Sequence, residues 1–136
     1  VVFFIRGNKD YYARIIDVAP GGEMIQILPN LFRQSHSFEG GLTYRFPDPG
    51  LGDDFELTVE PPYGTETVIV FASEMPVGDV AFSQYIGQFG VIDGETSDVE
   101  QSVRQILPRL KEMTDKKGPF SHVEFYESRW TLKTTE

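Results

Sequence analysis

The feature that most constrains the fold of this chain is a series of short β-type runs separated by turns that contain glycine or proline. Six runs fall within about seventy residues, which is the spacing of a β-sandwich or a β-barrel. The first three runs have tight connections that contain Gly7 and Gly21-Gly22, and these predict an antiparallel meander. The six runs cover residues 1–6, 11–18, 24–28, 42–46, 55–60 and 66–73.

Two of these runs, 42–46 and 55–60, alternate between apolar and polar residues, which is the pattern of a strand with one buried face. A third run, 66–73, is apolar on both faces and predicts a central strand that is covered on both sides. We therefore expect the inward-facing residues of these three runs to form the core. They are Leu42, Tyr44, Phe46, Phe55, Leu57, Val59, Ile69 and Phe71.

Helical patterns follow in the second half of the chain. The apolar spacing over residues 80–89 suggests one or two short helical turns. Ser97 and Glu100 fit a capping box, and the apolar spacing after them predicts a helix over residues 98–114. One face of that helix is expected to pack against the sheet through Val103, Ile106, Leu107 and Leu110.

The predicted architecture is mainly β (α+β). We expect residues 1–136 to form a single antiparallel, immunoglobulin-like β-sandwich domain with one or two helices appended near its C-terminal part. Residues 80–115 would be a helical insertion, and residues 122–134, which lack Gly, Asn and Pro, predict one long bulged strand. The chain begins with Val1 rather than Met, so we expect it to be a fragment of a longer protein.

The charge of the chain is unevenly distributed and restricts the class of partner. The formal net charge is −9, and residues 51–100 contain eleven acidic residues and no Lys or Arg. Nucleic acid binding requires cations that replace counterions on phosphates, so we expect no nucleic acid partner. The acidic middle either serves as a solvated surface or meets a basic protein surface or a divalent cation. No run approaches the roughly 18 apolar residues of a transmembrane segment.

Motifs that carry catalysis or bind cofactors are absent from the sequence. No P-loop, H-E-x-x-H motif or dinucleotide-binding glycine pattern is present, and no serine lies in a nucleophile elbow. The chain has no Cys and only two histidines, His36 and His122, which we expect to be solvated or locally hydrogen-bonded. We therefore expect no catalytic residues and no cofactor.

Two groups of acidic residues are the remaining candidates for chemistry. Oxygen ligands in a loop rich in Gly and Pro suit Ca²⁺, although we expect binding there to be weak or absent and the loop to be solvated. The members of this loop are Asp48, Asp53, Asp54 and Glu56. A pair of carboxylates could instead catalyse hydrolysis. The acids considered for that pair are Glu56, Glu60 and Glu66.

Several motifs in this order resemble the bacterial domain-of-unknown-function family DUF4384. They are Asn8-Lys9-Asp10-Tyr11-Tyr12, Ile27-Leu28-Pro29-Asn30, Gly41-Leu42-Thr43-Tyr44-Arg45-Phe46-Pro47, Phe55-Glu56-Leu57-Thr58-Val59 and the stretch from Glu60 to Ser73. The resemblance implies a domain of larger bacterial proteins, often exported ones, which favours the periplasm or the cell surface. It implies no established activity and supplies no functional residues.

Two functions follow as hypotheses. The first is a non-catalytic interaction or ligand-binding module that binds a protein or a glycan through loops at one end. Its candidate interaction turn consists of Pro62, Tyr63, Gly64 and Glu66, residue types that also serve turn geometry alone. The alternative is a small carboxylate-dependent hydrolase, which would show a cleft with a carboxyl group whose pKa is raised by burial. The oligomeric state is not predicted.

Overall fold

The computed structural model describes residues 2–53, 57, 61, 63–76, 78–104 and 125–135. Within them lie nine strands, one α-helix and one short 3₁₀ turn, η1 (Pro49–Leu51). The helix is α1 (Thr96–Arg104). The strands are β1 (Phe3–Arg6), β2 (Tyr11–Val18), β3 (Met24–Leu28), β4 (Ser37–Phe38), β5 (Thr43–Phe46), β6 (Thr65–Ser73), β7 (Gln84–Ile86), β8 (Phe89–Ile92) and β9 (Phe125–Lys133).

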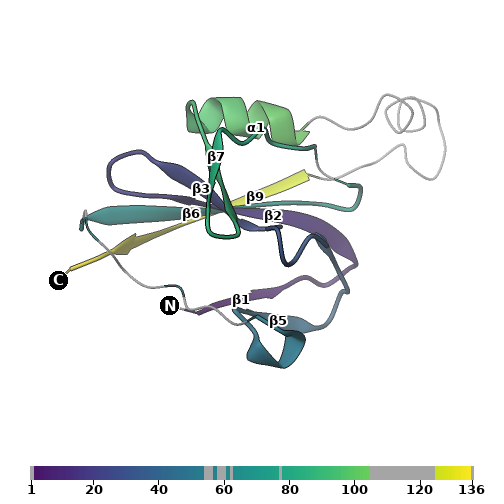
Figure 1. The fold of residues 1–136 in the computed structure, drawn as a ribbon. Helices are drawn as coiled ribbons and strands as arrows, with labels where there is room; N and C mark the ends of the chain where they lie inside the picture. Colours follow the sequence, from purple (N-terminus) through teal and green to yellow (C-terminus); the bar gives the residue numbers. More distant parts are fainter. Residues whose placement is uncertain are drawn as a thin grey trace.

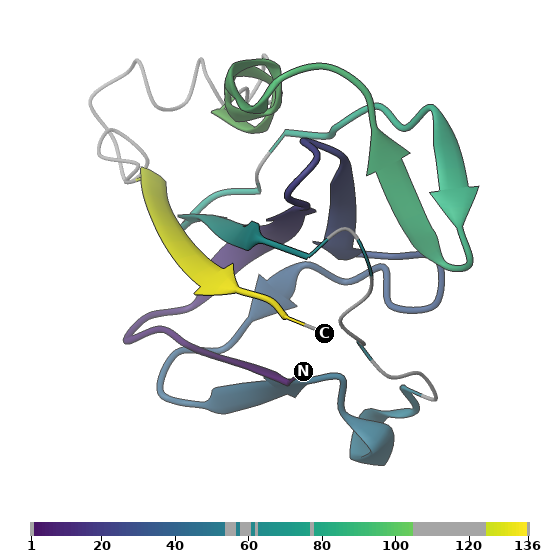
Figure 2. The same ribbon diagram turned by 90° about the vertical axis from the view of Figure 1, so that its left-hand side faces the viewer.

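The strands form two antiparallel sheets. The large sheet has the order β7-β8-β3-β2-β6-β9, and β4 pairs with the end of β2. The small sheet consists of β1 and β5. Figure 1 shows the large sheet between the small sheet on one side and α1 on the other, and Figure 2 shows β9 and β7 at its opposite edges. The expected mainly β, antiparallel fold with a helix near its C-terminal part is therefore confirmed.

Each face of the large sheet has its own hydrophobic core. Ile16, Ile69 and Phe71 pack under α1 with its buried Val99 and Val103. On the opposite face, Phe46 and the other inward residues of the small sheet pack against the large sheet, which makes a two-sheet sandwich on this side. These two layers explain why residues 66–73 are apolar on both faces, and the central, doubly covered position predicted for them is confirmed.

Most of the expected core residues that the structure describes lie inward. Phe46, Ile69 and Phe71 are buried. Tyr44 and Leu57 are half-buried and pack against the core that lies between the small sheet and the large sheet. Leu42 is 49% exposed, so its assignment to the core is wrong: the pairing of β5 with β1 begins only at Thr43, and Leu42 belongs to the preceding turn. Phe55 and Val59 lie outside the described residues.

The expected three-stranded meander is wrong for its first strand. β2 and β3 pair as predicted, but β1 pairs with β5 instead of β2. The turn after β1 is held by the loop before β5. In that contact, the Gly41 N–H donates to the Gly7 carbonyl oxygen at 2.7 Å, and the Gly40 N–H donates to Asp10 Oδ1 at 2.9 Å. These bonds direct β1 into the small sheet.

The segment after Pro76 also differs from the sequence prediction. Residues 84–92 form the hairpin β7–β8 instead of helical turns, so the helical insertion over 80–115 is wrong in this part. Gly87 takes a positive φ of 59° in the two-residue turn between Ile86 and Phe89, which a helix does not accommodate.

The helix that follows begins two residues before the predicted range, at Thr96. Ser97 lies inside it, so the predicted capping box is wrong. The Glu95 N–H instead donates to Asp98 Oδ2 at 2.9 Å. Val103 is buried against the sheet as expected. Ile106, Leu107, Leu110 and His122 lie outside the described residues.

The last segment is one long strand, as predicted, but its pairing with β6 is continuous from Phe125 to Lys133 and contains no bulge. No helix among the described residues is long and apolar enough to cross a membrane.

Candidate binding cleft

A cleft of about 800 Å³ lies between β1 and β9, above the face of the large sheet that the small sheet covers. Its floor is apolar and consists of Ile15 from β2 together with Val68, Val70 and Ala72 from β6. Figure 2 shows β9, in yellow, and β1, in purple, on the same side of the molecule. The cleft therefore lies where the large sheet and the small sheet both end.

β1 forms one wall of the cleft. Its burial alternates: Phe3 and Ile5 are half-buried against the core, whereas Phe4 and Arg6 are exposed. The strand pairs with β5 on one side. On its other side no strand among the described residues pairs with it, and residues 2–11 line the cleft without a break.

β9 forms the opposite wall. It pairs with β6 over nine residues, yet residues 127–133 are exposed on both faces of the strand. Trp130 is directly opposite Val68 in register, so it lies on the cleft face, and Leu132 lies two residues further along that face. The indole N–H of Trp130 donates to Ser128 Oγ at 2.8 Å, which orients the ring along the strand. Trp130 and Leu132 thus form an exposed apolar surface on this wall, next to the polar Ser128 and Thr131.

Charges around the cleft are partly compensated. Lys9 Nζ lies 3.2 Å from Glu74 Oε1, and Asp10 Oδ1 accepts a hydrogen bond from the Gly40 N–H. Arg6 and Lys133 are exposed and take part in no ion pair within the part of the chain that the structure describes. In a chain with a net charge of −9, Arg6 is thus a cation on the cleft wall that is available to a ligand, whereas Lys133 lies on the other face of β9, opposite Thr65.

A carboxyl pair lies on the same sheet face, beside the cleft floor. Asp17 is opposite Val68 in register, and its side chain is hydrogen-bonded to that of Glu66. Burial raises the pKa of Asp17 to about 8, and the hydrogen bond and negative charge of Glu66 add to the shift. The Asp17 carboxyl group is therefore protonated at neutral pH. The sequence analysis named Glu66 but missed Asp17. The only feature of the sequence that could have indicated Asp17 is the presence of a carboxylate within the β-type run 11–18.

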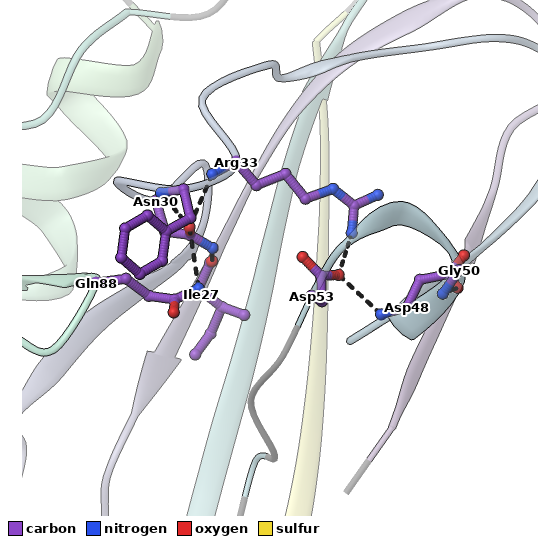
Figure 3. A network of polar contacts seen from close by, with 8 residues as sticks. Ile27, Asn30, Arg33, Asp48, Gly50, Asp53 and Gln88 are labelled. Atoms are coloured by element: carbon purple, nitrogen blue, oxygen red, sulfur yellow. Dashed lines mark hydrogen bonds and ion pairs between the residues drawn. The ribbon is translucent and has the colours of Figure 1, made fainter.

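The predicted acidic loop is stabilised by protein groups. Asp48 Oδ1 accepts the Gly50 N–H at 2.9 Å and caps η1. Asp53 is buried, and its Oδ2 accepts the Asp48 N–H at 2.7 Å and pairs with Arg33 Nη1 at 2.8 Å (Figure 3). Asp54 and Glu56 lie outside the described residues. Over the described ranges, no group of three or more His, Asp or Glu side chains is placed to hold a metal ion.

Arg33 connects this loop to the loop after β3. Asn30 Oδ1 accepts the backbone N–H of Arg33 at 3.0 Å and receives a further bond from Gln88 Nε2 at 3.2 Å, and Figure 3 shows the three residues together. The Arg33 guanidinium also lies 5.3 Å from the centre of the Phe46 ring. Asp48 and Asp53 thus belong to a network that holds two loops to the core.

The predicted interaction turn is divided between two environments. Tyr63 is exposed. Gly64 is bound to the residue after β9, because its carbonyl oxygen accepts the Thr134 N–H at 2.7 Å and its own N–H donates to Thr134 Oγ1 at 3.0 Å. Glu66 faces Asp17, and Pro62 lies outside the described residues. The turn therefore anchors the end of β9, the strand that forms a wall of the cleft.

A buried arginine, Arg14, lies on the helix side of the large sheet. Arg14 donates through Nε to the Gly78 carbonyl oxygen at 2.8 Å and through Nη2 to Asp79 Oδ1 at 2.6 Å. His36 lies near it and contacts the Tyr12 ring, with centroids 5.3 Å apart. Burial, followed by the charge of Arg14, lowers the pKa of His36. This cluster ties the segment after β6 to the sheet, and it lies apart from the cleft.

Comparison with known families finds a match over the first part of the chain. The model of a family described as Domain of unknown function (DUF4384) matches residues 1–76, which is more than half of the chain. The matched region contains the floor of the cleft and its β1 wall, whereas the β9 wall follows it. Comparison with curated proteins and with solved structures finds no match.

Proposed function

We propose a binding function for this chain, which belongs to DUF4384, a family described as a domain of unknown function. In this proposal the domain is a non-catalytic module, and the cleft between β1 and β9 binds an apolar segment of a partner molecule. The observation that carries the proposal is Trp130, which is 69% exposed on a wall of the cleft although it lies over an apolar floor.

The size and lining of the cleft support binding. Ligand sites in proteins are concave, mostly apolar and about 300–1,000 Å³ in volume, a range that includes this cleft of about 800 Å³. Exposed apolar groups that lie together mark interaction sites, because each of them costs free energy in water until it is covered. Polar side chains occur along the lining, but most of its exposed surface is apolar, which favours a protein segment over a glycan.

Trp130 is the only tryptophan of the chain, so its fluorescence reports on the cleft directly. The test titrates the protein with the apolar dye anilinonaphthalene sulfonate and follows energy transfer from Trp130. Binding in the cleft predicts saturable transfer that is weakened by Leu132→Ser. A matched control is Ile86→Ser, which alters an exposed apolar residue of the β7–β8 hairpin at the other edge of the sheet. Equal dye binding by both variants would contradict the proposal.

Beyond the segment that enters the cleft, the partner we propose presents a basic surface to the α1 side of the large sheet, which is the face opposite the cleft. Asp93, Glu95 and Asp98 are exposed around the start of α1, and no Lys or Arg occurs between residues 51 and 100. Such a partner would associate more slowly at high salt, because screening weakens attraction between exposed charges. Stopped-flow association at 50 and 500 mM salt tests this point, and an unchanged rate would contradict it.

We also propose that the domain is part of a larger bacterial, exported protein in the periplasm or at the cell surface. The support for this setting is the sequence resemblance alone. Fractionation of a bacterium that produces the parent protein, followed by detection with an antibody to this domain, tests it. Detection in the cytosol alone would refute it.

A hydrolase is the second candidate, and the Asp17–Glu66 pair is the observation that favours it. A carboxyl group whose pKa is raised by burial and that is hydrogen-bonded to a second carboxyl group resembles the dyads of general acid–base hydrolysis in which two carboxyl groups share a proton. The test measures turnover of nitrophenyl esters and glycosides by the chain and by Asp17→Asn and Glu66→Gln. Turnover that both variants abolish would support a hydrolase. Absence of turnover above the buffer rate would leave the binding module as the function.

A further inference from the structure

The two walls of the cleft are both edges of sheets. The large sheet ends at β9, the small sheet ends at β1, and neither strand has a second neighbour among the described residues. The cleft is lined by consecutive residues of each strand, including Phe3, Phe4 and Ile5 of β1 and Trp130, Thr131 and Leu132 of β9. Both inward-facing and outward-facing residues line it, so the cleft extends along the edges of the strands.

From this geometry we infer that the cleft is a strand-addition site for an extended partner segment in which apolar and acidic residues alternate. The inference rests on the proposed binding function and specifies the chemistry of the partner. A strand edge presents backbone N–H and C=O groups that lack a neighbour, and an extended peptide can pair with them. A bound segment would join the two sheets in the order β6-β9-partner-β1-β5.

The dimensions of the walls set the length of the segment. On β9 the lining residues lie between Ser128 and Leu132. A strand rises about 3.3 Å per residue, so this wall accommodates a segment of roughly five residues. β9 contains no bulge and no proline, and the side chains on its cleft face, Trp130 and Leu132 among them, carry no charge. None of the features that usually prevent strand pairing is therefore present on this wall.

The side chains of the walls determine the two faces of the partner segment. On the inner face, Phe3 and Ile5 of β1 lie across the floor from Trp130 and Leu132 of β9, so the inward residues of the segment should be apolar. Alternate residues of the segment would point outward. There they would lie between Arg6 on β1 and the outward face of β9.

The outward face of β9 contains more basic than acidic groups. Arg129 Nε pairs with Glu127 Oε2 at 3.1 Å, which leaves Lys133 as the cation without an ion pair among the described residues. Together with Arg6, it places a positive charge on each side of the inserted segment. Acidic outward residues complement these charges, whereas basic ones would be repelled.

The test uses the full 136-residue chain and the peptide acetyl-Glu-Val-Glu-Ile-Glu-Val-Glu-amide. Two comparison peptides isolate the two parts of the inference. One has Lys in place of every Glu, and the other has N-methyl groups on alternate amides, which removes backbone donors and retains the side chains. Binding is followed by Trp130 fluorescence, and amide hydrogen exchange of β1 and β9 reports pairing.

Strand addition predicts that the acidic peptide binds, slows exchange of the outward amides of β9 between Ser128 and Leu132, and binds at least tenfold more tightly than either comparison peptide. The double variant Arg6→Glu, Lys133→Glu should reverse the preference between the acidic and the basic peptide. Both substitutions are on exposed side chains, so they test charge without disturbing the core. The matched control is Arg45→Glu, an exposed arginine on β5 that does not line the cleft.

The outcomes separate this inference from the proposed function. If the dye binds at Trp130 but N-methylation does not change the affinity of the peptide, strand addition is overturned, whereas the proposal that the cleft binds apolar groups is retained. If neither dye nor peptide binds, both fail. If sedimentation shows self-association with slowed exchange in β9 and no peptide binding, the occupant is a second copy of the chain, and an alternating acidic partner is excluded.

Discussion

Trp130 and Val68 are paired across β9 and β6 on the same face of the large sheet, yet Val68 is 4% exposed and Trp130 is 69% exposed. The difference arises because the small sheet covers β6 but does not extend over β9. The apolar face of the sheet is thus continuous, whereas its cover ends one strand early. An incomplete cover of this kind is the structural basis of the cleft.

The first prediction compares the contribution of the exposed Trp130 to stability with that of Phe71, a buried residue on the other face of the large sheet. Trp130→Ala should change the free energy of unfolding by less than about 0.5 kcal/mol, as is usual for an exposed site. Phe71→Ala should cost about 3–5 kcal/mol, because Phe71 is fully buried under α1 and its removal leaves a cavity. Urea denaturation measures both. A large loss for Trp130→Ala would mean that the ring is covered in solution, and the cleft would then be closed.

The second prediction concerns the contact that places β1 as a wall of the cleft. A Cβ atom on Gly40 would lie 2.5 Å from the backbone carbonyl carbon of Lys9, so the turn after β1 would have to move. Gly40→Ala should therefore destabilise the protein by about 1–3 kcal/mol, the usual cost of overpacking. Gly21→Ala is the matched control, since a Cβ at Gly21 meets nothing within 4 Å. Thermal denaturation compares the two, and equal melting temperatures would refute the contact.

The local pattern of the sequence identified most strands but could not identify which strands are neighbours. β1 and β2 are consecutive and joined by a Gly-containing turn, which is the pattern of a hairpin, yet contacts of Gly40 and Gly41 direct β1 to β5. Pairing between segments that are forty residues apart depends on such tertiary contacts, which no periodicity encodes. The β7–β8 hairpin was missed for a related reason, because apolar residues at short spacing fit a helix as well as a strand.

The cleft also could not be predicted from the sequence, because it depends on contacts between distant segments. Trp130 lies in a run that alternates regularly with polar residues, and nothing in that run indicates that its apolar face remains uncovered. Asp17 was missed because its partner Glu66 belongs to another strand. By contrast, the acidic loop was visible in the sequence, but the basic residue that binds Asp53 comes from a different loop. Sequence patterns thus identified candidate groups and not their partners.

The third prediction is the pH dependence of stability that Asp17 causes. Its pKa is raised from 3.8 in the unfolded chain to about 8 in the folded protein. The unfolded state therefore loses this proton first as pH rises, and the folded state loses stability between about pH 4 and pH 8, by up to about 1.4 kcal/mol per pH unit. Asp17→Asn keeps the hydrogen bond to Glu66 without an ionisable proton. Its stability, measured by urea denaturation from pH 4 to pH 8, should decline less steeply than that of the wild type. Parallel curves would show that Asp17 ionises normally.

The fourth prediction concerns the loop that contains Asp48 and Asp53. Asp53 accepts one bond from the Asp48 N–H and one from Arg33, and both donors lose their partner in Asp53→Ala. The loss should cost about 1.5–3 kcal/mol, the range for hydrogen bonds to charged groups.

Because the same oxygen would have to leave Arg33 to bind a cation, we expect Ca²⁺ binding to this loop to be weak or absent. Calorimetric titration with Ca²⁺ measures this, with Asp48→Asn as a variant that leaves the Arg33 pair intact. A sub-micromolar site that Asp53→Asn abolishes would show that the loop exchanges its arginine for a metal ion, and the loop would then become a functional centre in addition to the cleft.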